Sequence, residues 1–186
     1  MSNKAEKAIE IAEKITDLYE TNRLLEYDPY EYQKRFHDAK DMTGRLARQR
    51  LLMAANKTGK TFCGASEMAF HLTGRYPKWW QGARFSRPIT AWAAGNTTAN
   101  TRDIVQAELL GEPGDEDEFG KGAIPKQYIV GTPLRMPGVP NAYQSLNVKH
   151  VSGRNSKLIF KSYEQGKMQW MGKAVDVTWL DEEPPQ

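Results

Sequence analysis

"LLMAANKTGKTFCGA", residues 51–65, nearly matches the phosphate-binding pattern Gly-x-x-x-x-Gly-Lys-Ser/Thr. Ala54 stands where that pattern has its first glycine. In such a loop, successive backbone N–H groups surround the phosphates, the lysine reaches the terminal phosphates and the hydroxyl binds Mg²⁺. Because an alanine costs only freedom in the turn, we predict that Lys60 and Thr61 take these roles. The predicted nucleotide-binding residues of the loop are Ala55, Asn56, Lys57, Thr58, Gly59, Lys60 and Thr61.

The segments on either side of the loop are those that such a site requires. "RLARQRLLMAA", residues 45–55, runs into a short apolar strand, and "TFCGASEMAFHLTG" predicts a helix that Gly74 ends. One face of this helix carries Phe62, Ala65, Ala69 and Leu72. The predicted order is therefore strand, loop and helix.

A second unit of the same kind follows. It has a strand near residues 89–94, a polar turn with Asn96 and Thr97, and an amphipathic helix that ends at Gly111. Two such units predict an α/β fold with a mainly parallel central sheet flanked by helices. Residues 111–141, rich in glycine and proline, predict a surface loop, and "SLNVKHV" and "KLIFKSY" on either side of "SGRNS" predict a hairpin.

The last apolar strand, in "AVDVTWLDEEPPQ", ends in three consecutive acids. Nucleotide sites of open α/β sheets lie at the carboxyl ends of strands, so these acids point to the same site as the loop. We predict that Asp181 holds Mg²⁺ through water and that Glu182 orients or deprotonates the attacking water. Glu183 is a possible substitute, and a solvated strand end is the alternative interpretation.

Composition excludes several classes of protein. The 186 residues are 39% hydrophobic and 26% charged, and no apolar run approaches the ~20 residues that span a bilayer. The acid-containing N-terminal segment is no signal or transit peptide, so we expect a cytoplasmic protein. One cysteine and three widely spaced histidines argue against disulfide or zinc chemistry, and a net charge of +3 is too small to indicate nucleic-acid binding. Residues 3–25 carry a helical apolar stripe that we expect to pack against the body or against a partner helix.

Five segments stand in a set order between residues 27 and 186: "PYEYQKRFH", "MAANKTGKTFCGASEMAFHLTGRYPKWWQG", "ITAWAAGNTT", "HVSGRNSKLIFKSYEQG" and "VDVTWLDEEPP". Together they resemble the N-terminal ATPase domain of the large terminase subunit of tailed phages. The resemblance implies a P-loop NTPase of the additional-strand type that uses ATP and Mg²⁺ to drive genome packaging into the procapsid. It also implies double-stranded DNA, the terminase small subunit and the portal protein as partners, a homo-oligomeric ring, and action in the cytoplasm of the bacterial host.

Matching positions carry the family's roles. Gln33 resembles the glutamine that recognises adenine, whose amide can donate to and accept from one base edge. A glutamine on a helix surface is the alternative. Many family members have an arginine within the loop, where this chain has Asn56 and Lys57. The arginine that offsets transition-state charge is therefore unassigned: a neighbouring subunit could supply it, or one of Arg75, Arg84, Arg87, Arg102 and Arg154.

We expect residues 1–26 to form the N-terminal amphipathic helix and residues 27–186 to form a partial P-loop ATPase domain, incomplete at its C-terminus and without the family's nuclease domain. Such a chain on its own should bind ATP feebly and show little or no turnover. Two other functions stay open: a helicase-like DNA-dependent ATPase and a non-catalytic interaction module. DNA contact through residues 145–175, which hold six basic side chains and one acidic one, competes with an ordinary lysine-bearing hairpin. Trp79 and Trp80 are expected to pack rather than stack on bases.

Overall fold

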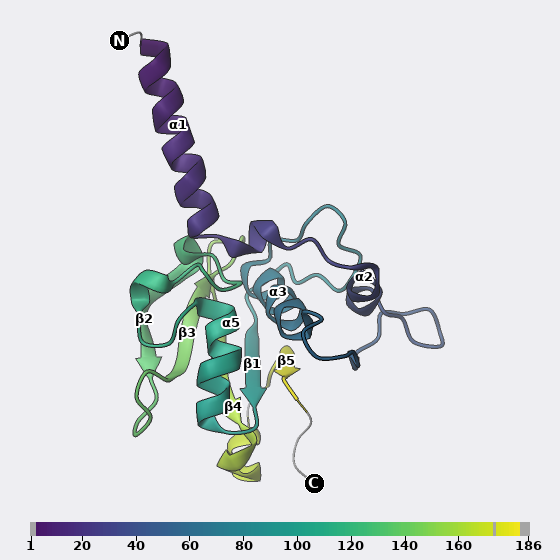
Figure 1. The fold of residues 1–186 in the computed structure, drawn as a ribbon. Coiled ribbons are helices and arrows are strands. Elements are labelled where there is room, and N and C mark those ends of the chain that lie inside the picture. Colours follow the sequence, from purple (N-terminus) through teal and green to yellow (C-terminus); the bar gives the residue numbers. More distant parts are fainter. Residues whose placement is uncertain (1–2, 173, 183–186) are drawn as a thin grey trace.

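A computed structural model describes residues 3–172 and 174–182. Its centre is a five-stranded sheet in the order β2-β3-β4-β1-β5 (Figure 1). The strands are β1 Thr90–Gly95, β2 Ile129–Arg135, β3 Tyr143–Lys149, β4 Asn155–Ser162 and β5 Val177–Leu180. The predicted α/β fold is confirmed, and so are the strand near residue 90, the hairpin and the strand that precedes the acids.

The sheet is mixed rather than mainly parallel. β1 pairs in parallel with β4 and β5, whereas the pairs β2–β3 and β3–β4 are antiparallel. The prediction of a mainly parallel sheet is wrong because a short turn joins β3 to β4, and such a connection permits only antiparallel pairing. β2 lies within the predicted surface loop, because its residues Gly131 and Pro133 are typical of loops rather than strands. It tolerates both residues because, among the described residues, it is an edge strand whose single neighbour is β3, in an irregular register.

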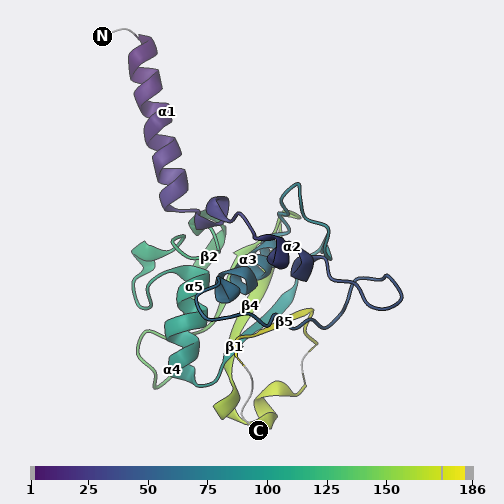
Figure 2. The same ribbon diagram turned by 45° about the vertical axis from the view of Figure 1, so that its right-hand side comes forward.

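Helix α3 (Lys60–Thr73) and the continuous helical segment formed by α4, η2 and α5 (residues 98–110) cover one face of this sheet. Figure 2 shows α3 and α5 over the same face, where the apolar core contains Ala93, Leu158 and Phe160 from the central strands. Short 3-10 turns after β4 cover part of the opposite face, where Trp170 packs edge-on against Trp92. The helical elements are α1 Asn3–Glu20, η1 Arg23–Glu26, α2 Glu31–His37, α3 Lys60–Thr73, α4 Thr98–Asn100, the π-helical η2 Thr101–Gln106, α5 Ala107–Leu110, η3 Glu116–Glu118, η4 Lys126–Tyr128, η5 Tyr163–Gln165 and η6 Lys167–Trp170.

The N-terminal helix α1 extends away from the body (Figures 1 and 2). Its apolar side chains, among them Ile11, Ile15 and Leu18, are exposed. The expectation that this stripe packs against the body is therefore wrong, and packing against a partner helix stays a prediction. None of the helices in the described part of the chain is long and apolar enough to cross a membrane.

The segment before the phosphate loop is not a strand. Leu51 and Met53 are 80% and 81% exposed, and neither belongs to the sheet. Among the described residues β5 pairs with β1 alone, so no strand lies beside residues 51–55 to receive their backbone hydrogen bonds. The predicted strand is wrong here because a strand needs a neighbour as well as an apolar pattern.

A buried ionic cluster connects α2, α3 and the chain just before the loop. Its centre is Glu67 of α3, which is 6% exposed. The Glu67 carboxylate pairs with His37 Nδ1 at 2.7 Å, with His71 Nε2 at 3.2 Å and with the guanidinium of Arg50. Arg50 also donates to the carbonyls of Phe36 and His37. The cluster therefore fixes both ends of the segment that leads from α2 into the loop.

Glu67→Gln should lower the free energy of unfolding by about 3 kcal/mol at pH 7, since it leaves the partly buried guanidinium of Arg50 without its anion and the buried rings of His37 and His71 without a charged partner. Burial alone raises the pKa of the Glu67 carboxyl, but the hydrogen bonds from His37 and His71 and the charge of Arg50 outweigh it and hold this pKa well below its ordinary 4.5. A lowered pKa stabilises the fold above the ordinary value, so this contribution should disappear as the pH falls below about 4.5. Urea unfolding across pH 3 to 7 measures both effects.

The matched control is the exposed Glu112→Gln, which should change little. Equal stability of Glu67→Gln and the unsubstituted chain at pH 7 would show that the cluster contributes nothing to folding.

Candidate nucleotide-binding site

The phosphate loop turns directly into α3. Gly59, the residue before the helix, has φ 77°, a left-handed conformation that favours glycine. Lys60 Nζ donates to the carbonyls of Ala54 and Ala55, both at 2.7 Å, and Thr58 Oγ1 donates to the Ala55 carbonyl at 2.8 Å. Ala54 is not among the described non-glycine residues with positive φ, so the loop needs no glycine at that position.

Two neighbouring side chains of α2 donate hydrogen bonds to carbonyl groups of the loop. Tyr32 donates its hydroxyl to the Thr58 carbonyl, and Gln33 Nε2 donates to the Gly59 carbonyl at 3.1 Å. The other polar atom of Gln33, Oε1, accepts from Tyr30 N at 2.8 Å. Gln33 is 3% exposed, so it is not on the helix surface, and it supports the loop. Sequence reasoning missed Tyr32, because only a contact with a residue 26 positions away gives it a role.

The acids after β5 lie beside the loop. Asp181 N donates to the Ala94 carbonyl at 2.8 Å, which continues the β1–β5 pairing by one residue. Burial raises the pKa of the Asp181 carboxyl, as do the charges of Glu182 and Glu108, while Lys60 and a hydrogen bond with Thr61 oppose them in part. The structure therefore places Lys60, Thr61 and Asp181 close together, and their roles in binding stay predictions.

These oxygen atoms fit Mg²⁺ by their chemistry. Mg²⁺ is usually held by one or two protein oxygens together with phosphate oxygens and water. Thr61 and Asp181 lie close enough for the Thr61 hydroxyl to lower the pKa of the Asp181 carboxyl, and together they supply a hydroxyl and a carboxylate. Within the described residues no group of three or more His, Cys, Asp or Glu side chains is arranged to hold a metal ion.

Glu182 is held at both its backbone and its side chain. Its φ is 66°, and Tyr163 donates its hydroxyl to the Glu182 carbonyl at 3.2 Å. Asn96 Nδ2 donates to Glu182 Oε2 at 2.7 Å. Glu183, the predicted substitute, lies outside the described residues.

The five candidate arginines make other contacts or lie elsewhere. Arg75 and Arg84 lie over the rings of Tyr128 and Tyr76. Arg87 pairs with Asp176 and Arg102 with Asp103, and Arg154 lies in the turn between β3 and β4. In the part of the chain that the structure describes, none of the five contacts the loop or the acids after β5.

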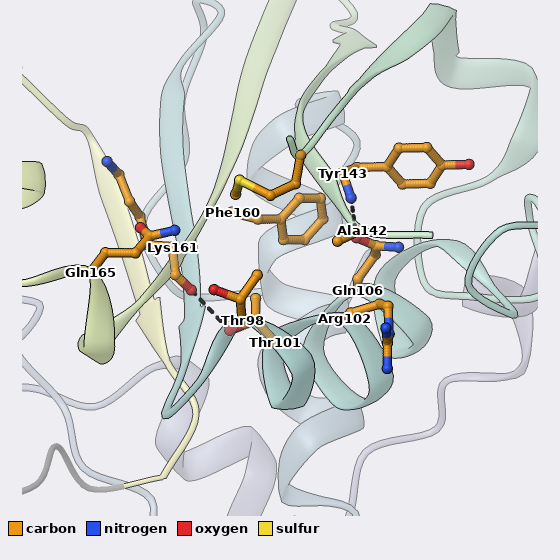
Figure 3. Close-up of a pocket in the computed structure, with 10 residues that line it drawn as sticks. Thr98, Thr101, Arg102, Gln106, Ala142, Tyr143, Phe160, Lys161 and Gln165 are labelled. Carbon is orange, nitrogen blue, oxygen red and sulfur yellow. Dashed lines mark hydrogen bonds between the residues drawn. The ribbon is translucent and has the colours of Figure 1, made fainter. Parts of the chain in front are cut away.

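A small hollow near the sheet is separate from this site. Figure 3 shows it between η2 and strands β3 and β4, with the hydrogen bonds from Thr101 Oγ1 to the Lys161 carbonyl and from Tyr143 N to Gln106 Oε1. None of its lining residues belongs to the predicted nucleotide site.

The basic side chains of the hairpin lie partly on one sheet face. Lys157 and Lys161 alternate with the buried Leu158 and Phe160, and the register places Lys149 on the same face as Lys157. Lys161 donates to the Gln169 carbonyl at 2.6 Å and lies over the Trp92 ring, whereas Lys149 and Lys157 are exposed. Lys173 lies outside the described residues.

Trp79 and Trp80 pack in an aromatic cluster with Tyr27 and Phe70, which confirms the predicted packing.

Tyr32→Phe should cost about 1 kcal/mol of stability, because it removes one hydrogen bond to the loop and leaves the ring in place. The backbone amides of residues 56–60 should also exchange faster with deuterium. The exposed Tyr19→Phe on α1 is the matched control. Unchanged exchange in the loop would show that Tyr32 does not support it.

Comparison with known proteins agrees with the arrangement. Residues 51–186 match the family described as "Terminase large subunit, T4likevirus-type, N-terminal". The "Terminase, large subunit" of Salmonella phage P22 is 38% identical over 194 residues, an alignment that covers 95% of this chain and 38% of that protein. The chain thus spans about two fifths of the length of this relative. No solved structure matches this chain. Since the family match covers roughly three quarters of the chain, the chain belongs to the terminase large-subunit family.

Proposed function

We propose that this chain is the ATP-hydrolysing part of a phage DNA-packaging motor, with a P-loop NTPase fold of the additional-strand type. The observation that carries the proposal is that Asp181, held directly after β5 by its hydrogen bond to the Ala94 carbonyl, lies close enough to Lys60 and Thr61 at the start of α3 for both to lower the pKa of its carboxyl. Chance similarity to a phosphate-loop pattern does not require an acid from the far end of the chain to meet the loop's hydroxyl. Membership of the terminase large-subunit family supports the same conclusion.

Each residue has a role in binding or hydrolysis. Backbone N–H groups of residues 55–61 surround the phosphates, and Lys60 exchanges its two carbonyl contacts for the terminal phosphates. Thr61 and Asp181 would hold Mg²⁺, and the ion would supply charge neutralisation for the phosphates. Glu182 orients the attacking water and accepts its proton. Catalysis of this kind depends on positioning and on electrostatic stabilisation.

The partners follow from the packaging role. Double-stranded DNA, the terminase small subunit and the portal protein are proposed partners, and the site of action is the cytoplasm of the bacterial host. Exposed Lys149 and Lys157 with Arg154 provide the cationic surface for DNA phosphates. The arginine that offsets transition-state charge comes from the next subunit of a homo-oligomeric ring, because none of the candidate arginines contacts the site in the described residues.

Two other functions are tested by the same measurements. A helicase-like DNA-dependent ATPase would share the nucleotide site and unwind duplex DNA, which a packaging motor does not require. A non-catalytic interaction module would show neither binding nor turnover of ATP.

Lys60→Ala should weaken ATP binding at least tenfold, because the loop loses the cation that is directed at the terminal phosphates. Glu182→Gln should bind ATP normally and lose turnover, since an amide cannot accept a proton. Binding is measured by calorimetry on the 186-residue chain, and turnover is measured on the full-length gene product. The exposed Lys78→Ala is the control for the loss of a positive charge.

Unchanged binding in Lys60→Ala would reject the nucleotide loop. Full turnover in Glu182→Gln would show that Glu182 is not the catalytic carboxylate, and Glu183→Gln would then be the next variant to measure.

Gln33→Ala should weaken the binding of ATP and GTP together, because the Gly59 carbonyl loses its donor. The ratio of the two dissociation constants tests adenine recognition. A ratio that also moves toward one gives Gln33 the base-reading role that the resemblance implies. Wild-type affinity for both nucleotides would contradict any role in binding.

A further inference from the structure

The turn after β1 meets the acids after β5. β1 and β5 are parallel neighbours, and their register pairs Ala94 with Leu180. Asn96 and Glu182 each lie two residues beyond this pair, so the pairing of the two strands places them opposite one another. The 2.7 Å hydrogen bond from Asn96 Nδ2 to Glu182 Oε2 is the result.

Asn96 is itself held in place by the end of β4. Its carbonyl accepts from Glu164 N at 3.3 Å, and the Glu164 carboxylate accepts from Thr98 N at 2.6 Å. The Thr98 hydroxyl also lies 3.1 Å from Ser162 Oγ. The segment that carries Asn96 is therefore bound at three points to the end of β4 and to the 3-10 turn η5 that follows it.

The amide of Asn96 is directed by the glutamate. Asn96 Oδ1 is buried and has no hydrogen-bond partner among the described residues. A buried amide oxygen of this kind costs free energy, so the local packing does not explain an asparagine at this position. Within the described part of the chain, the Asn96 side chain hydrogen-bonds through Nδ2 to Glu182.

Glu182 needs such a contact to keep one orientation. The residue is exposed, and its φ of 66° lies in the left-handed region that residues with a Cβ rarely adopt. Conformations of this kind persist where the surroundings impose them, and they are concentrated at functional sites. Tyr163 holds the backbone through the Glu182 carbonyl, and its ring stacks on Trp170.

We propose that Asn96 is a positioning residue for ATP hydrolysis, whose side-chain amide holds the Glu182 carboxylate toward the water that attacks the nucleotide. The inference rests on the proposed function of Glu182. Asn96 acts on the orientation of the carboxylate and makes no contact with the phosphate loop, so it affects turnover and leaves nucleotide binding unchanged. A displacement of about 1 Å in a catalytic group can cost on the order of 100-fold in rate.

Kinetics of the protein as its own gene encodes it provide the first test. Asn96→Ala should lower kcat for ATP by about 10- to 100-fold while the dissociation constant for ATP changes less than about twofold. Asn96→Asp has the same shape but places a second carboxylate against Glu182, so it should lose at least as much activity. The control is Asn100→Ala, an exposed asparagine of the adjoining helix α4, which should retain wild-type kcat. Wild-type kcat in both Asn96 variants would overturn the inference.

A structural measurement separates this inference from the proposed function. In the 186-residue chain without nucleotide, Glu182→Ala should shift the side-chain NH₂ resonances of Asn96 in a ¹⁵N–¹H spectrum and leave those of Asn100 unchanged. Unshifted Asn96 resonances would show that the contact does not exist. If Glu182→Gln keeps full turnover, the role of Glu182 in the proposed function fails and positioning for hydrolysis fails with it. If Glu182→Gln abolishes turnover but Asn96→Ala does not lower it, only the role of Asn96 is lost.

Discussion

The site depends on how closely β5 can approach α3. Gly64 lies one turn into α3, and a Cβ at this position would stand 2.5 Å from the Trp179 indole nitrogen. Without a side chain at residue 64, Trp179 packs against the helix and β5 takes its place beside β1. Asp181 follows two residues later, and this spacing sets its distance to Thr61. A glycine outside the predicted motif residues therefore leaves the space that lets the two halves of the candidate site lie close together.

Local pattern predicted the elements that depend on their own residues. Helix α3, with Gly74 in a left-handed conformation at its end, the strand β1, the hairpin and β5 all lie where the sequence places them. The errors concern elements that depend on a neighbour. Residues 51–55 have an apolar pattern but no adjacent strand, and β2 contains a proline and a glycine yet forms because β3 is there to pair with it.

The candidate site divides in the same way. Lys60, Thr61 and Asp181 were predicted as site residues from motif spacing, because the chemistry of phosphate and Mg²⁺ favours those residue types, and the structure places them close together. The residues that hold the loop and Glu182 in place, Tyr32 and Asn96, were not predicted as site residues, since a tyrosine and an asparagine fit many positions. Their roles arise from pairings between distant segments. Reactive groups can be predicted from a single sequence more easily than the groups that hold them in position.

Helix α1 also affects how the molecule moves through solution. An α-helix of 18 residues is about 27 Å long, and α1 projects from a body of modest size (Figure 1). A rod attached to a rounded body increases hydrodynamic drag without adding much mass. Gel filtration of the 21.1 kDa chain should therefore report a larger apparent mass than the true one. Early elution by itself is consequently no proof of ring formation, and the molar mass has to come from light scattering or sedimentation equilibrium.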